Sequence, residues 1–179
     1  MKPLIILLLL LCLSLIAFGQ QATPEYPDSG FTNKAEAKNQ FVNKLKEGKW
    51  IDYMGRDGDT DNYMLTVYLK GIPIGISRIY INSTGKIWLE KPYVNGMENG
   101  IEKMYDSFGK LVLETPYVND SANGVQKRYY SNGKILCKTV YKNNIGTVPQ
   151  YYKKDGTPRP KGYHPPITIS VDANGNEIK

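Results

Sequence analysis

The sequence predicts an all-β protein, an antiparallel meander of about five stacked β-hairpin repeats with a short N-terminal helix. A tyrosine recurs at intervals of 25, 24 and 24 residues, at Tyr68, Tyr93, Tyr117 and Tyr141. In each interval a glycine stands seven residues after the tyrosine, and a second tyrosine stands five residues after that glycine. Clusters of Gly, Asn, Asp and Ser separate stretches of Tyr, Ile, Val, Leu and Thr, as expected for strands joined by tight turns.

The amino-acid composition excludes a disordered chain and argues against a nucleic-acid-binding protein. The chain has 179 residues, of which 41% are hydrophobic and 11% aromatic, too large an apolar share for a disordered chain. Its net charge of +6 is too mild to indicate a nucleic-acid partner.

Residues 1–19 are predicted to be a secretory signal peptide. Lys2 precedes an unbroken apolar run over residues 4–13, which is too short for a convincing membrane span. Small residues at the −3 and −1 positions favour cleavage between Gly19 and Gln20. We therefore expect a secreted or periplasmic protein, with an uncleaved anchor as the alternative.

Two segments follow the leader. Residues 20–32, which contain prolines and glycine, are predicted to form a flexible linker. Residues 33–47 are predicted to form an amphipathic helix that covers the first hairpin, with Asn33 and Glu36 as a capping pair and Gly48 as terminator. Its apolar positions, spaced four apart, are Ala37, Phe41 and Leu45.

Residues 48–179 are predicted to form the repeat domain. Along the second arm of each hairpin, period-2 alternation assigns four columns to the core face. These columns begin at Ile87, Leu89, Lys91 and Tyr93 and recur 24 and 48 residues later. The opposite face of this arm carries the acidic positions Glu90 and Glu114 and is expected to be wetter.

Catalytic and metal-binding constellations are scarce. His164 is the only histidine and stands beside prolines, so we interpret it as a loop residue. Cys137, the one cysteine outside the leader, shares a column with Leu89 and is expected to be buried, with no disulfide partner. The acidic turn with Asp57, Asp59 and Asp61 lacks the glutamate of a calcium loop. No catalytic residue, metal ligand or cofactor is therefore assigned.

One pattern across the repeats indicates a binding surface. A basic residue stands three positions after each repeat glycine, on the face of the second tyrosine. This ladder consists of Arg78, Lys103 and Lys127 beside Tyr80, Tyr105 and Tyr129. Such a surface suits sugars, acidic glycans or anionic peptides. In the alternative interpretation, the alkyl stems pack on the tyrosine rings while the charges reach water.

Several motifs resemble the MORN-repeat variant of bacterial secreted proteins, which is often linked to the YwqK antitoxin-like family. They are Tyr93-Val-Asn-Gly96, Asn99-Gly100, Asn123-Gly124, Tyr129-Tyr130 and Asn132-Gly133-Lys134. The resemblance covers roughly residues 48–175. It implies a MORN-like, non-enzymatic repeat module for protein or membrane-surface interaction. The turn at Asn119-Asp120 departs from the Asn-Gly pattern.

Together these observations predict an exported module that binds another protein or an anionic cell-envelope polymer. Three alternatives stay open: a peripheral binder of anionic lipid, an antitoxin-like or immunity-like protein, and a glycan-active enzyme. The enzyme would need Glu90 and Glu114 as its paired carboxylates. The lipid binder would need an exposed basic surface with Trp50 or Trp88.

Overall fold

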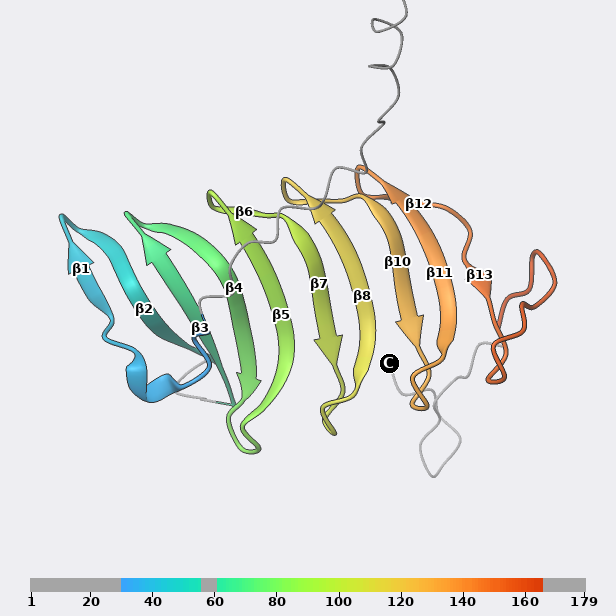
Figure 1. The fold of residues 1–179 in the computed structure, drawn as a ribbon, viewed down its shortest axis with the longest axis horizontal. Helices are drawn as coiled ribbons and strands as arrows, with labels where there is room; N and C mark the ends of the chain where they lie inside the picture. The colour runs from blue at the N-terminus through green and yellow to red at the C-terminus, as the bar shows by residue number, and fades with distance from the viewer. Residues whose placement is uncertain (1–29, 56–60, 166–179) are drawn as a thin grey trace, which may run out of the picture.

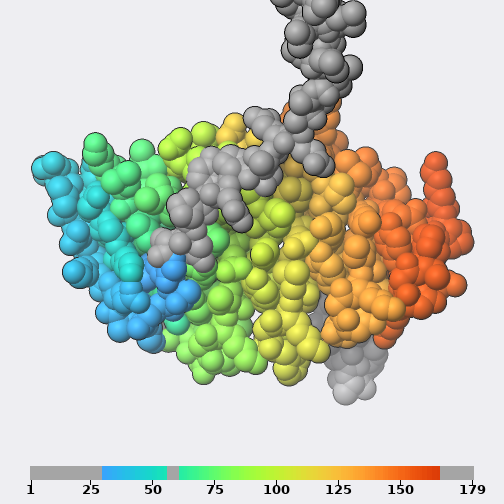
Figure 2. All heavy atoms as spheres, viewed as in Figure 1, coloured from blue at the N-terminus to red at the C-terminus, as the bar shows by residue number. Residues whose placement is uncertain are grey.

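The structure is a computed structural model that describes residues 30–55 and 61–165. It confirms the all-β prediction, because the described chain forms an antiparallel meander that crosses the molecule in chain order (Figure 1; Figure 2). The elements are η1 (Lys34–Glu36), β1 (Gln40–Val42), β2 (Leu45–Met54), β3 (Asn62–Leu69), β4 (Ile72–Ile81), β5 (Lys86–Val94), β6 (Met97–Glu98), β7 (Gly100–Tyr105), β8 (Leu111–Val118), β9 (Ser121–Ala122), β10 (Gly124–Tyr129), β11 (Ile135–Lys142), β12 (Ile145–Gly146) and β13 (Gln150–Tyr151). The short strands β6 and β9 pair with β5 and β8, and β12 and β13 both pair with β11.

Five tight turns line the upper edge of the sheet in Figure 1. Both central residues of each turn have positive φ, between 48° and 85°, as in the type I′ turns that suit twisted hairpins. The pairs are Asn43-Lys44, Lys70-Gly71, Asn95-Gly96, Asn119-Asp120 and Asn143-Asn144. The turn at Asn119-Asp120 therefore keeps the backbone geometry of the Asn-Gly turn although its sequence departs from it.

Glycine turns line the lower edge, and a lysine after each of three of them joins neighbouring units. The Nζ atoms of these lysines donate to a backbone carbonyl of the next turn at 3.2, 3.3 and 3.0 Å. The donor and acceptor residues are Lys86 and Ser107, Lys110 and Ser131, and Lys134 and Asp155. The recurring Gly-Lys pair thus stabilises contacts between repeats.

The predicted helix over residues 33–47 is wrong. Asn33 does act as a cap, since its side chain accepts from Ala35 N at 3.0 Å, but the only helical segment in the described chain is the single 3-10 turn η1. The chain then enters the hairpin β1–β2. A helix of fifteen residues or so is marginal by itself, whereas β2 gains a continuous ladder with β3 from Gly48 to Met54.

The predicted linker over residues 20–32 is wrong at its C-terminal end. Phe31 is fully buried, in a cluster with Tyr63, Leu65 and Tyr80. The segment from Gly30 to Asn39 therefore covers the first strands, the task predicted for the helix. Residues 20–29 and the predicted signal peptide lie outside the described residues.

The two faces of the sheet are named here by their side chains. The charge face carries Arg78, Glu90, Lys103 and Glu114, which lie opposite one another across β4, β5, β7 and β8. The tyrosine face carries Tyr93, Tyr117 and Tyr141, with the buried side chains of Leu89, Thr115, Cys137 and Thr139. The predicted core columns that begin at Leu89 and Lys91 do lie together on this second face.

The prediction that the column beginning at Ile87 shares a face with the columns of Leu89 and Lys91 is wrong. The register shifts between Ile79 and Tyr80, so that Ile87 pairs with Tyr80 and packs against the cluster on the charge face. The same shift recurs at Tyr105 and Tyr129. Such a β-bulge reverses the alternation of side chains, which period-2 reasoning cannot detect.

Both ends of the sheet have features that hinder addition of a further strand. At the β2 edge, the Asn39 side chain bonds both the N and the O of Ile51, at 2.8 and 2.9 Å. At the other end, Pro158 and Pro160 stand where the second arm of the fifth hairpin would donate backbone bonds. Within residues 30–55 and 61–165, no helix is long and apolar enough to cross a membrane.

Candidate functional site

The predicted basic ladder is interleaved with glutamates. Arg78 lies opposite Glu90, and Lys103 lies opposite both Glu90 and Glu114, which in turn lies opposite Lys127. The basic ladder and the glutamates therefore share one face of the sheet. Alternation assigns faces within one strand, but the register set by the turns decides which residue of the next strand stands opposite.

Short contacts neutralise much of this ladder. Arg78 Nε donates to Glu90 Oε1 at 3.0 Å, and Tyr105 Oη donates to Glu90 Oε2 at 2.7 Å. Lys127 Nζ lies 3.4 Å from Glu114 Oε2, which also accepts from Tyr129 Oη at 2.5 Å. We call the series Arg78, Glu90, Lys103, Glu114, Lys127 and Lys138 the charge row.

The three tyrosines of the ladder have different surroundings. Tyr80 is buried and stacks on Tyr63 with ring centroids 5.0 Å apart, so it is a core residue. Burial, followed by the hydrogen bond to Glu114, raises the pKa of Tyr129 to about 12. Burial and the bond to Glu90 raise the pKa of Tyr105 as well. These phenols therefore keep their protons at neutral pH and donate hydrogen bonds to the glutamates.

The first basic residue of the ladder is also part of the core. Arg78 is only 4% exposed, and its Nη1 lies 3.5 Å from the backbone oxygen of Phe31. A soluble ligand would meet Lys103 and Lys127 rather than Arg78 or Tyr80.

A polar cluster on the tyrosine face was not found by sequence reasoning. Lys91 Nζ lies 2.9 Å from Glu98 Oε2 and 2.8 Å from Glu102 Oε2. Within the described part of the chain, Glu98 Oε1 is buried without a hydrogen-bond partner. Burial, the largest cause, raises the pKa of Glu98, although Lys91 opposes this shift. The sequence contained one sign of this cluster: Ala122 and Gln126 stand in the next repeat at the positions of Glu98 and Glu102.

Between the charge row and the upper turns, the charge face carries an apolar row. Its members form three cross-strand pairs, which are Ile76 with Pro92, Ile101 with Pro116, and Val125 with Val140. Ile101, Val125 and Val140 are 47%, 42% and 50% exposed. Sequence reasoning did not assign this apolar row to a binding surface, although each of its residues stands two positions from a charge of the charge row, on the same face.

The remaining candidates are structural or isolated. Cys137 is buried as predicted, and burial raises the pKa of its thiol. His164 is exposed. Asp57 and Asp59 lie outside the described residues. Among the residues described, no three His, Cys, Asp or Glu side chains come together as a metal site.

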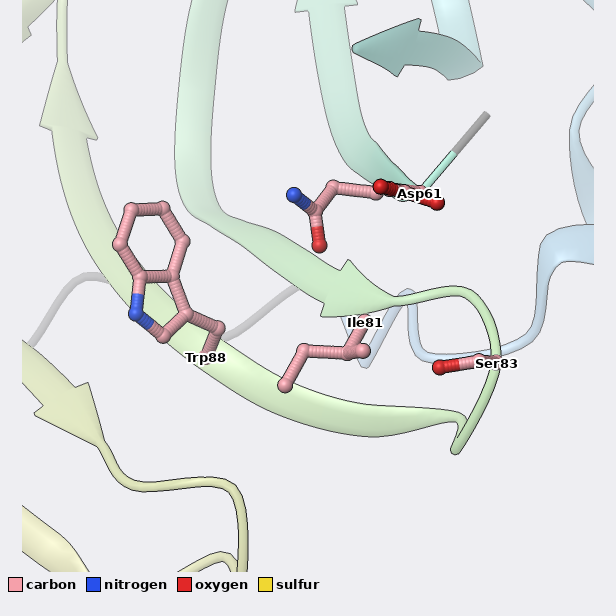
Figure 3. A pocket seen from close by; sticks show the side chains of 5 residues that line it. Asp61, Ile81, Ser83 and Trp88 are labelled. Carbon is pink, nitrogen blue, oxygen red and sulfur yellow. The ribbon is translucent and has the colours of Figure 1, made fainter. Parts of the chain in front are cut away.

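An open hollow of about 420 Å³ lies at the lower ends of β3, β4 and β5 (Figure 3). Its lining consists of Asp61, Asn62, Ile81, Ser83 and Trp88, of which only Asp61 is charged. In Figure 3 the Trp88 and Ile81 side chains stand on adjacent strands at its border. Such a lining provides shape and one carboxylate.

The repeated unit itself is the feature that comparison with known families identifies. Residues 98–119 and 122–143 match the MORN repeat variant. Two consecutive segments of the chain are therefore similar to MORN repeats. Each runs from a short strand, β6 or β9, through a complete hairpin to the next type I′ turn. MORN repeats are often binding modules, and the chain fits a non-enzymatic repeat module.

The match is to the MORN repeat alone and does not extend to the antitoxin-like family or to secretion. A search of curated proteins finds no match to this chain. The MORN repeats include Lys103, Glu114 and Lys127, together with Ile101 and Val125 of the apolar row.

Proposed function

We propose that the protein is an exported, non-enzymatic binding module whose charge face receives a segment of another protein. The leader at residues 1–19 supports export. The two MORN repeats support a binding role.

The exposed apolar row carries this proposal. A repeat protein that stacks hairpins needs apolar contacts between neighbouring units, but it gains little from apolar side chains that point into water. Exposed aliphatic side chains gathered on one face, as Ile101, Val125 and Val140 are, are typical of a surface that a partner covers. The hindered sheet edges favour the face over strand addition as the route of binding.

A capture experiment with matched variants tests this function. The chain beginning at Gln20 is immobilised and incubated with envelope extract of the source cell, and the bound proteins are quantified by mass spectrometry. The double variant Ile101→Ser, Val125→Ser should retain about tenfold less of the specific partner, because interface affinity concentrates in a few apolar contacts.

The control is the double variant Met54→Ser, Phe108→Ser, which removes two exposed apolar side chains away from the apolar row. It should capture the same proteins as the parent chain. If both double variants capture alike, the apolar row is not the docking surface. Thermal unfolding of both variants checks that the fold is intact.

A further inference from the structure

The alternation of the charge row ends at the fourth hairpin. From Arg78 to Lys127, each charged residue pairs across the strands with a residue of the other charge. Lys127, however, also pairs with Lys138. Lys138 occupies the column of Glu90 and Glu114, which accept bonds from the basic residue and the tyrosine beside them. Two like charges directly opposite each other destabilise a sheet unless something neutralises them.

The positive charge of the described chain is concentrated around this break. Between residues 61 and 120, six basic residues stand beside seven acidic ones. Between residues 121 and 165, nine basic residues stand beside one acidic residue, Asp155. The field of the last two units is therefore positive, and the field of the preceding units is nearly balanced.

Exposed apolar side chains surround the two lysines. Val125 and Val140 are opposite each other next to the Lys127–Lys138 pair, and Lys142 and Ile145 are opposite each other at the following turn. Ile145 is 76% exposed, and the Lys127 side chain is 40% exposed. The surface thus combines three ammonium groups with three aliphatic groups on one face.

We propose that the partner presents an acidic, apolar polypeptide segment to this surface, and that one of its carboxylates binds between Lys127 and Lys138. This carboxylate takes the place that Glu90 and Glu114 occupy in the preceding hairpins. The proposal rests on the proposed function and names the chemistry of the partner.

A polypeptide fits this surface better than a polyanionic polymer does. A sugar or phosphate polymer satisfies the lysines but leaves Val125, Val140 and Ile145 facing polar groups. A segment that alternates acidic and aliphatic side chains satisfies both kinds of group.

The test uses a fluorescent peptide rich in glutamate, valine and leucine, with a twin in which glutamine replaces every glutamate. Fluorescence anisotropy with the full chain should show tight binding of the acidic peptide only, weakening as salt rises. The variant Lys138→Glu restores the alternation, so it should weaken binding about tenfold or more. Its thermal midpoint should equal or exceed that of the parent, because the introduced carboxylate would pair with Lys127.

The matched control is Lys38→Glu, which makes the same charge change at an exposed position near the opposite end of the sheet. It should leave affinity within about twofold, as expected for a distant screened charge. Equal weakening by both variants would mean that net charge alone attracts the peptide, and it would overturn the proposal. So would unchanged binding by Lys138→Glu.

Vesicles of phosphatidylglycerol provide a further arm. If they bind the parent in a Lys138-dependent way while the acidic peptide does not bind, the occupant is an anionic membrane and the proposal is wrong. If the acidic peptide does not bind but the proposed function holds, the double variant Ile101→Ser, Val125→Ser still captures less of the partner. If the proposed function is wrong, this double variant captures the same proteins as the parent chain. The capture experiment therefore distinguishes a wrong partner chemistry from a wrong function.

Discussion

At the scale of single residues, equivalent repeat positions have different roles because their cross-strand neighbours differ. Arg78 and Lys127 occupy the same column, yet Arg78 is buried beneath Phe31 and Lys127 reaches solvent. The N-terminal segment covers the column only at its first position. A repeated residue type therefore indicates a repeated backbone position and does not by itself indicate a repeated function.

The buried carboxylate of Glu98 leads to a prediction about pH. Its pKa in the folded chain is raised above the ordinary 4.5, so the folded state disfavours the charged form relative to the unfolded state. The resulting cost is present at neutral pH and disappears as pH falls through the raised pKa to 4.5. Glu98→Gln should therefore unfold at a higher temperature than the parent at neutral pH.

Thermal unfolding between neutral pH and the ordinary glutamate pKa measures this effect. The difference between parent and Glu98→Gln should shrink as the solution becomes more acidic. Glu36→Gln, at an exposed glutamate, provides the comparison. A constant difference across the range would show that Lys91 already offsets the burial of Glu98.

At the scale of the element, two pairs of neighbouring hairpins are in close contact through a glycine and a proline. Gly124 has φ of 122°, and a Cβ there would lie 2.8 Å from Pro116 Cγ. Gly100 and Pro92 repeat this arrangement at 2.9 Å. The start of β7 at Gly100 and of β10 at Gly124 therefore needs both the positive φ and the absence of a side chain.

Gly124→Ala should therefore destabilise the fold by about 1–3 kcal/mol, because strain in the backbone adds to the clash with Pro116. Gly133→Ala also has a positive φ, of 80°, but a Cβ there would meet nothing within 4 Å, so it reports the backbone cost alone. Urea unfolding measures both. The double variant Gly124→Ala, Pro116→Ala should recover part of the loss, and no recovery would argue against the clash.

At the scale of the whole molecule, the described sheet is long, largely single-layered and covered at one end. Each hairpin contacts mainly its neighbours, so stability accumulates from unit to unit. The Phe31 cluster covers the first units, while the last units keep exposed aliphatic and basic side chains. This asymmetry favours binding at the C-terminal end of the sheet.

The proposed export gives the prediction at this scale. The protein isolated from its source cell should begin at Gln20, because the apolar run of signal length ends in a small-residue cleavage pattern. Intact-mass measurement of the protein, compared between cell interior and exported fraction, checks it. An exported form that still begins at Met1 would contradict the cleavage.

Much of the fold follows from short-range chemistry that a sequence displays directly. Positive φ in a tight turn favours Gly, Asn or Asp, so the 24-residue spacing of turns was sufficient to predict the meander and its units. The burial of Cys137 followed from the alternation of side chains between Cys137 and Tyr141 of β11, where the register with β10 does not shift.

Other features depended on contacts between distant residues. The segment at 33–47 has the apolar spacing of a helix, and only its pairing with a neighbouring strand makes it a hairpin. The bulge before Tyr80 moved Ile87 to the other face, and the cross-strand register placed Glu90 opposite Arg78. The sequence by itself therefore determined the repeat, its turns and its strand-by-strand alternation. Only the tertiary structure decided which side chains meet, because register and bulges arise from pairing energies summed over whole strands.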